Sequence, residues 1–207
     1  MERRRHPRQF IERSESEEYL HKAAWSVVNR QLRRAEKKRR GALYDDLVAM
    51  VFAFHSIEGY LNFVGEKIAP DLWKNEKHEF GNDLYKKLKA ICERCEIDPP
   101  EKSKCPYSTI EALKDLRNKM THPKTHRAKE ETKFTDGQEP EIFSPTHLET
   151  LVSHEKALLA RDDVRKIADL IHPAARGRFP DSGLGSDPFD GITSMRNSST
   201  SLLSDDP

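Results

Sequence analysis

The sequence predicts an all-α fold, an up-and-down bundle of four main helices with a short hairpin or loop insertion. Two observations lead to this prediction. Apolar residues recur at intervals of three and four over long stretches, which is the period of one face of an α-helix, and glycine or proline separates the stretches. With 207 residues, 35% of them hydrophobic, the chain is long enough for one sizeable core.

The first helix is expected to begin at Ser14 and to run toward Arg40. Ser14 and Glu17 have the spacing of a capping box, in which each side chain bonds a free backbone N–H of the other residue. The apolar positions that follow have helical spacing and define one narrow buried face. Gly41 interrupts the pattern and is expected to end the helix.

The N-terminal part of the chain is basic, although the whole chain is close to neutral. Residues 1–40 hold 13 Lys or Arg against 6 Asp or Glu, a net charge of +7. Residues 1–13 are expected to form a basic extension, and the charge is densest at 33–40, where it can guide the backbone of a nucleic acid. A solvated helix face is the alternative interpretation of this charge run.

The strongest predicted element is the second helix, over 43–68, which Pro70 ends. Its apolar residues alternate in steps of four and three without a miss: Leu43, Leu47, Met50, Phe54, Ile57, Leu61, Val64 and Ile68. At about 100° per residue they form one stripe, as a helix docked on others requires. His55, Glu58 and Asn62 lie at the edge of that stripe and project from one side.

Two shorter helices are expected next. The third starts after Gly81 and is closed by Pro99, with an apolar face of Leu84, Leu88, Ile91 and Cys95. The fourth begins at Ser108 with a second capping-box spacing, and directs Ile110, Leu113, Leu116 and Met120 inward. Pro123 disfavours helical geometry at the residue before it, so this helix should loosen at His122.

The last third of the chain is expected to be less regular. An Asp-Gly pair within the polar stretch 124–143 predicts a small hairpin. Ser144, followed by proline, has the pattern of a helix start and opens a last helix to Ile171, with a kink near Arg161. The tail 173–207 is rich in glycine and serine, and we expect it to be disordered.

The sequence favours a soluble, cytoplasmic protein that does not associate with membranes. It has no run of about 18 continuous apolar residues and no apolar core of a secretory signal at its start. Three cysteines are too few for a disulfide scaffold, so the thiols are expected to be reduced.

The sequence predicts no metal site and no cofactor. Cys92 and Cys95, with Cys105 nearby, resemble part of a zinc site, but a fourth ligand is missing and Cys95 completes an apolar stripe. His122 and His126 are four residues apart, but a proline between them breaks the helix that would align them. No glycine-rich loop for a nucleotide phosphate is present.

The end of the fourth helix combines a guanidinium, an amide and an imidazole within six residues: Arg117, Asn118 and His122. These groups suit cleavage of RNA, whose own 2′-hydroxyl is the nucleophile, so that no metal is needed. His122 can move protons, Arg117 can stabilise charge on the phosphate oxygens, and Asn118 can orient either partner. Because Arg117 and His122 are five residues apart, about 140° on a helix, convergence requires an unwound helix end or a second copy of the chain.

This stretch resembles the motif of the HEPN superfamily, all-helical domains marked by an Arg, four to six intervening residues and a His, commonly with a polar residue after the Arg. Arg117, Asn118 and His122 have this form. The long helix that contains Glu58 and Asn62 is similar to the family's helix that bears a Glu and an Asn.

The resemblance covers residues 14 to about 171, so we treat 14–172 as one HEPN-like domain. Many HEPN proteins are metal-independent endoribonucleases, often toxins or phage-defence components, and act as dimers with the motif at the interface. Others have lost activity and serve as binding or assembly modules. The resemblance therefore implies an RNA substrate, a homodimer and, for a toxin, an antitoxin partner.

The predicted catalytic set is Arg117, Asn118, His122 and Glu58, with Glu58 orienting the guanidinium. In the alternative interpretation, Arg117 pairs with Glu58 as part of the fold, and His122 only caps a helix end. His55 and Asn62 are expected to be polar edge residues.

Overall fold

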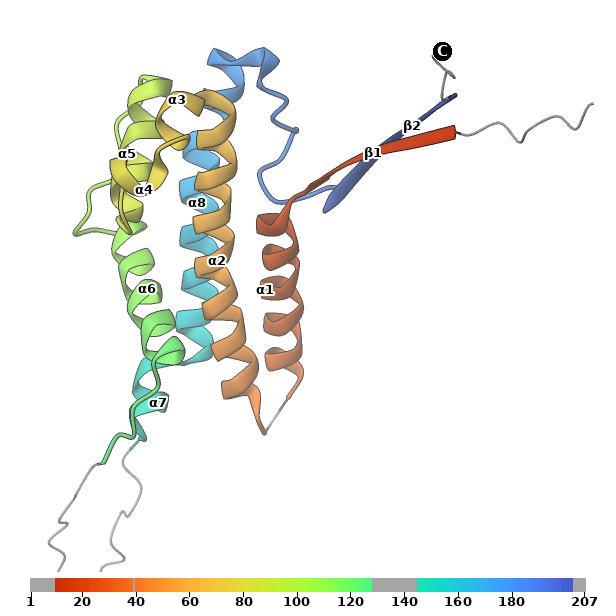
Figure 1. Cartoon of the computed structure of the whole chain (residues 1–207). Helices are drawn as coiled ribbons and strands as arrows, with labels where there is room; N and C mark the ends of the chain where they lie inside the picture. The colour runs from red at the N-terminus through yellow and green to blue at the C-terminus, as the bar shows by residue number, and fades with distance from the viewer. Residues whose placement is uncertain (1–9, 39, 128–144, 203–207) are drawn as a thin grey trace, which may run out of the picture.

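The protein is mostly helical (Figure 1). The computed structural model describes residues 10–38, 40–127 and 145–202. The elements are β1 (Phe10–Glu18), α1 (Leu20–Lys37), α2 (Ala42–Ile68), α3 (Pro70–Trp73), α4 (Glu76–Glu79), α5 (Leu84–Cys95), α6 (Tyr107–Thr121), α7 (His147–Leu151), α8 (His154–Arg178), the 3-10 turn η1 (Pro180–Ser182) and β2 (Ser194–Leu202). The predicted all-helical character is confirmed, apart from one two-stranded sheet within these ranges. Most of the predicted hairpin at 124–143 lies outside the described residues.

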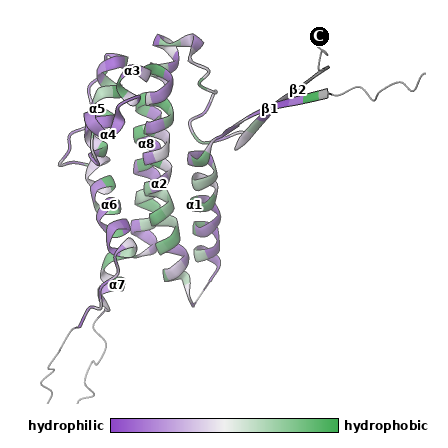
Figure 2. Ribbon diagram, in the orientation of Figure 1, coloured by the Kyte–Doolittle hydropathy of each residue, from purple (hydrophilic) through white to green (hydrophobic). Residues whose placement is uncertain are grey.

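α2 is the central helix of the fold. It packs against α1, α5, α6 and α8, and Figure 1 shows it between α1 on one side and α5 and α6 on the other. Hydrophobic residues concentrate along it (Figure 2). The predicted helix is confirmed, and most of its apolar stripe is buried.

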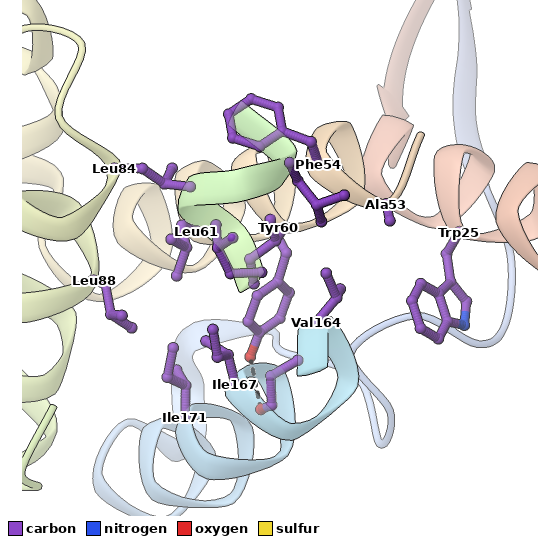
Figure 3. Packing of buried hydrophobic residues seen from close by; sticks show 14 of the residues in the cluster. Trp25, Ala53, Phe54, Tyr60, Leu61, Leu84, Leu88, Val164, Ile167 and Ile171 are labelled. Atoms are coloured by element: carbon purple, nitrogen blue, oxygen red, sulfur yellow. Dashed lines mark hydrogen bonds between the residues drawn. The ribbon is translucent and has the colours of Figure 1, made fainter. Parts of the chain in front are cut away.

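The core is assembled from side chains of several helices, among them α1, α2, α5, α6 and α8. Figure 3 shows Phe54 and Leu61 of α2 with residues of α5, α8 and α1, the labelled ones being Leu84, Leu88, Val164, Ile167, Ile171 and Trp25. Tyr60 points toward α8 and is fully buried. Its hydroxyl lies 3.2 Å from His172 Nδ1, which satisfies the one polar group of this ring.

The predicted start of the first helix is wrong. The segment around Ser14 is strand β1, which pairs antiparallel with β2 from Phe10 opposite Leu202 to Glu18 opposite Ser194. The sheet projects away from the helices (Figure 1). A capping box is a local signature, whereas this strand depends on a partner near the other end of the chain, so the local pattern gave the wrong element.

The short helices show how side chains decide helix ends. Asp83 caps α5 by accepting hydrogen bonds from the backbone N–H groups of Tyr85 (2.9 Å) and Lys86 (3.3 Å). By contrast, within the described residues no side chain caps α6, so the box predicted at Ser108 does not form. α6 has the predicted extent within one residue, whereas α5 begins as expected but ends at Cys95, before Pro99.

The predicted single last helix is wrong as well, because the structure has two. Thr146 caps α7 through a capping box with Glu149, and Ser144 lies outside the described residues. Val152 then adopts extended geometry and is buried, and Ser153 caps α8. The break therefore places an apolar side chain in the core, and α8 continues through the region where a kink was predicted.

The tail from 173 to 207 was predicted to be disordered, and this is wrong for its described part. α8 continues through Pro173 because residues beyond it still pack, Ala175 being fully buried. Leu184 and Phe189 are buried too, and the Phe189 ring stacks on Trp25 with centroids 4.4 Å apart. A few apolar side chains are sufficient to order a segment whose overall composition is polar.

Polar contacts attach residues 184–190 to α1 and α8. Arg165 Nη2 lies 2.7 Å from Asp187 Oδ2, and Lys22 Nζ donates to the Asp190 carbonyl at 2.9 Å. Burial acts to raise the pKa of Asp187, but bonds from Arg165 and from backbone N–H groups outweigh it and lower this pKa to about 2.

Among the described residues, one helix, α2, is long and apolar enough to cross a membrane by length and composition, with a mean hydropathy of 1.4 over 18 residues. More than half of that stretch, 56%, is buried inside the protein, as in the core helix of a soluble protein. The predicted cytoplasmic location stays a prediction.

The contact between Gly65 of α2 and Trp73 of α3 gives a test of packing. A Cβ built on Gly65 overlaps the indole ring of Trp73, which is itself buried. We expect Gly65→Ala to lower the free energy of unfolding by about 1–3 kcal/mol, because either the indole or the helix must move. Gly177→Ala in α8, where a Cβ meets nothing within 4 Å, is the matched control and should be neutral or slightly stabilising. Urea unfolding followed by circular dichroism measures both, and equal effects would contradict the packing argument.

Two buried histidines predict acid sensitivity. Burial lowers the pKa of His21 to about 4 and, in the same direction, the pKa of His172. A neutral imidazole in the folded state binds fewer protons than in the unfolded state, so stability is complete above pH 6.5 and falls as the pH drops toward 4. The loss assigned to His21 is about 3 kcal/mol.

Urea unfolding at several pH values between 7 and 4.5 measures this loss, and His21→Phe, which preserves an aromatic ring against Phe63, should reduce it. An unchanged pH profile in that variant would rule out His21 as the source. The contribution of Asp187 is lost only at lower pH, between about 4 and 2, so the two effects are separable.

Candidate functional site

The motif residues lie on the last turn of α6 and just beyond it. Ile110, Leu113 and Leu116 are buried and attach this helix to the core. Met120, predicted to point inward, is 43% exposed. As the following proline predicts, helical geometry ends at His122, whose backbone N–H still donates to the Asn118 carbonyl at 3.0 Å.

The structure brings Arg117 and Glu58 together across α6 and α2. Arg117 Nη2 lies 3.6 Å from Glu58 Oε1, and the guanidinium lies over the Phe54 ring, 4.8 Å from its centroid. The Arg117 side chain is 28% exposed, and its buried Nε has no hydrogen-bond partner among the described residues. Arginine is well suited to such a position because its planar cation stacks on an aromatic ring while its nitrogens remain available to an anion.

Arg117, Asn118 and Glu58 line one polar pocket of about 380 Å³ between α2, α5 and α6. The pocket also contains Asn62 and Lys87. Its walls therefore combine cations, amides and a carboxylate, the groups that bind phosphate and hydroxyl groups of a ligand.

Lys87 is the pocket residue that sequence reasoning missed. It is buried, its Nζ donates to Asn62 Oδ1 at 2.7 Å, and it forms an ion pair with Glu76 of α4. The available signal was its place on the apolar stripe of α5, three residues after Leu84 and four before Ile91. A lysine at such a position needs buried partners, which here are an amide and a carboxylate.

His122 lies at a different pocket. It is exposed and lines a hollow of about 660 Å³ together with His126, His147 and Met120. The rings of His126 and His147 stack there with centroids 4.4 Å apart. Asn118 lines this pocket as well as the first one.

One chain therefore does not bring together the two groups on which the predicted RNA cleavage depends. Arg117 and His122 open onto separate pockets, in agreement with the angle of about 140° between positions five apart on a helix. His55 and Asn62 of α2 have polar partners nearby. His55 Nδ1 lies 3.8 Å from Glu58 Oε2, and Asn62 Oδ1 accepts a hydrogen bond from Lys87.

The cysteines are free thiols with different surroundings. Cys92 and Cys95 are buried, and Cys105 is exposed. Burial raises the pKa of Cys92 to about 12 and also raises that of Cys95, so both are protonated at neutral pH and neither is a ready thiolate ligand. Among the described residues, no group of three or more His, Cys, Asp or Glu side chains is placed to hold a metal ion.

Comparison with known proteins adds no relative. No family model, no curated protein and no solved structure matches the chain. The resemblance to the HEPN superfamily therefore depends on the Arg117-to-His122 motif and on the helix that carries Glu58.

Proposed function

We propose that the chain is a metal-independent endoribonuclease of the HEPN type that acts as a homodimer in the cytoplasm. The observation that carries the proposal is the position of Arg117: a half-buried guanidinium supported by Phe54 and Glu58, and open to a polar pocket beside Asn118. In this proposal the helices form an up-and-down bundle of four main helices, on which the motif is mounted at one helix end.

The chemistry requires no cofactor. The 2′-hydroxyl of the substrate attacks the adjacent phosphorus, the bond to the 5′ oxygen of the next nucleotide breaks, and a cyclic phosphate remains. His122 takes the proton from the hydroxyl or returns one to the leaving oxygen. Arg117 stabilises the charge on the phosphate oxygens, and Asn118 orients the phosphate or the imidazole.

Glu58 has a positioning role in this mechanism. At 3.6 Å its carboxylate is close enough to hold the guanidinium and far enough for a phosphate to compete for it. The stacking of Arg117 on Phe54 restricts the side chain, so part of the entropic cost of ordering it is met before substrate binds.

The proposal includes a second copy of the chain. Since Arg117 and His122 face different pockets, a single linkage meets both only where two copies place their motif helices against each other. The exposed basic residues of α1 and the turn after it then guide the RNA backbone: Arg33, Arg34, Lys37, Lys38 and Arg40. Two of them, Arg34 and Lys38, also pair with Asp45.

The second candidate function is a non-catalytic helical module for dimerisation or for binding a nucleotide or RNA. The Arg117–Glu58 pair favours it, because the same contact serves a purely structural role. A toxin or phage-defence effector kept silent by an antitoxin shares the chemistry of the first proposal and differs only in regulation.

Cleavage of total RNA in the presence of EDTA tests the leading proposal. We expect the wild-type protein to cleave, and His122→Ala and Arg117→Ala each to lower the rate by at least about 100-fold, since each removes a proton carrier or a charge-stabilising group. Product ends analysed for cyclic phosphate identify the chemistry.

The controls use the same residue types at exposed sites elsewhere in the fold. His78→Ala and Arg94→Ala should cleave at the wild-type rate, and circular dichroism should show that all variants are folded. Arg117→Lys keeps the positive charge but loses the planar guanidinium. A lower rate in this variant therefore tests the role of Arg117 even if Arg117→Ala does not fold. A folded wild-type protein that leaves RNA intact without any inhibitor present supports the module instead.

Mixing two inactive variants tests the shared site. A dimer of one Arg117→Ala chain and one His122→Ala chain retains one guanidinium and one imidazole, contributed by different copies. We therefore expect the mixture to recover part of the activity after subunit exchange, while each variant alone stays inactive. Sedimentation should give a dimer, and a strictly monomeric protein that still cleaves RNA would contradict the shared site.

A further inference from the structure

A separate pocket of about 530 Å³ lies between α1 and α8. Two guanidiniums and one imidazole line it: Arg33 from α1, and Arg161 and His154 from α8. Among the described residues, its lining is distinct from the linings of the pockets at Arg117 and His122. The cleavage step uses none of these residues, although Arg33 also belongs to the basic face proposed to guide the RNA backbone.

The imidazole of His154 is held by a buried carboxylate. Asp46 of α2 is 2% exposed, and its Oδ1 lies 2.9 Å from His154 Nδ1. A carboxylate accepts but does not donate, so the proton of this bond is on Nδ1, and Nε2 is the ring nitrogen left for a ligand. An orienting carboxylate behind an imidazole that lines a pocket is an arrangement for binding and not only for packing.

The two guanidiniums are available to an anion. In the part of the chain that the structure describes, Arg161 pairs only with Asp162, a neighbour in sequence that is half exposed, and such a surface pair contributes little stability. Arg33 is exposed in the basic part of α1. Because they come from different helices, the two side chains approach the pocket from two sides, which suits the several oxygens of one phosphate.

The remaining side chains of the pocket restrict the chemistry of the ligand that fits. Trp25, Leu32 and Leu158 supply apolar surface, whereas Glu36 and Asp190 supply carboxylates. The two carboxylates balance the formal charge of the two arginines, so a simple anion gains little net attraction. A ligand that carries both a phosphate and hydroxyl donors satisfies both groups.

We infer that this pocket binds a sugar phosphomonoester, either a free sugar phosphate or a nucleoside monophosphate. Arg33 and Arg161 hold the phosphate, His154 Nε2, Glu36 and Asp190 accept hydrogen bonds from the hydroxyls of the ligand, and the apolar wall lies against the sugar or base. The volume is in the range of sites for small ligands. This inference does not depend on the endoribonuclease proposal.

Isothermal titration of the full chain with adenosine 5′-monophosphate, ribose 5-phosphate, inorganic phosphate and adenosine tests the inference. The two phosphomonoesters are expected to bind, with inorganic phosphate and adenosine each at least tenfold weaker. The ester that binds more tightly identifies the ligand. Tighter binding of adenosine 5′-monophosphate indicates a nucleotide whose base lies on the apolar wall, and tighter binding of ribose 5-phosphate indicates a sugar phosphate.

Arg33→Gln and Arg161→Gln should each weaken binding of the better ester about tenfold, or about 1.4 kcal/mol. Arg30→Gln, an exposed residue of α1 outside the pocket, is the matched control and should bind as the wild type does. The inference is overturned if neither ester binds, if both pocket variants bind like the wild type, or if Arg117→Ala abolishes binding. RNA cleavage by the same variants is a separate measurement, so the two proposals can fail independently.

Discussion

The burial of α2 is the constraint on which the rest of the structure depends. The helix packs against α1, α3, α5, α6 and α8, and Ile57, Tyr60 and Val64 are fully buried. A helix enclosed in this way is fixed in rotation as well as in position, because turning it would expose apolar surface at about 25 cal/mol per Å². The polar residues at the margins of the stripe are therefore placed by hydrophobic packing and not by their own contacts.

Both candidate sites use this fixed helix as their base. On the side of α5 and α6, Phe54 and Glu58 hold the guanidinium of Arg117. On the side of α1 and α8, Asp46 holds the imidazole of His154. In each case α2 supplies a well-positioned carboxylate and a neighbouring helix supplies the group proposed to meet a ligand. Groups held this way lose little further freedom on binding, which favours both recognition and catalysis.

The separation of Arg117 and His122 follows from the same rigidity. α6 stays regular up to Thr121, so its last turn is not unwound and the two side chains are not brought together. The two side chains can converge through an unwound helix end or through a second copy of the chain. The helix end is not unwound in the structure of one chain. Lys87 reinforces the difference between the pockets, since it adds a buried cation on the Arg117 side only.

The sequence by itself determined the helical class, the extents of α2 and α6, the start of α5, and the residues of the motif, because helix period and proline or glycine breaks are properties of neighbouring residues. Only the tertiary structure decided the strand at Ser14, the ordered segment around Phe189, the burial of Lys87 and the contact of Asp46 with His154. Each of these depends on residues far apart in the chain, whose proximity is set by packing around α2. Local sequence patterns do not indicate which distant residues come together. The tail was therefore predicted to be disordered, and the pocket between α1 and α8 was not predicted.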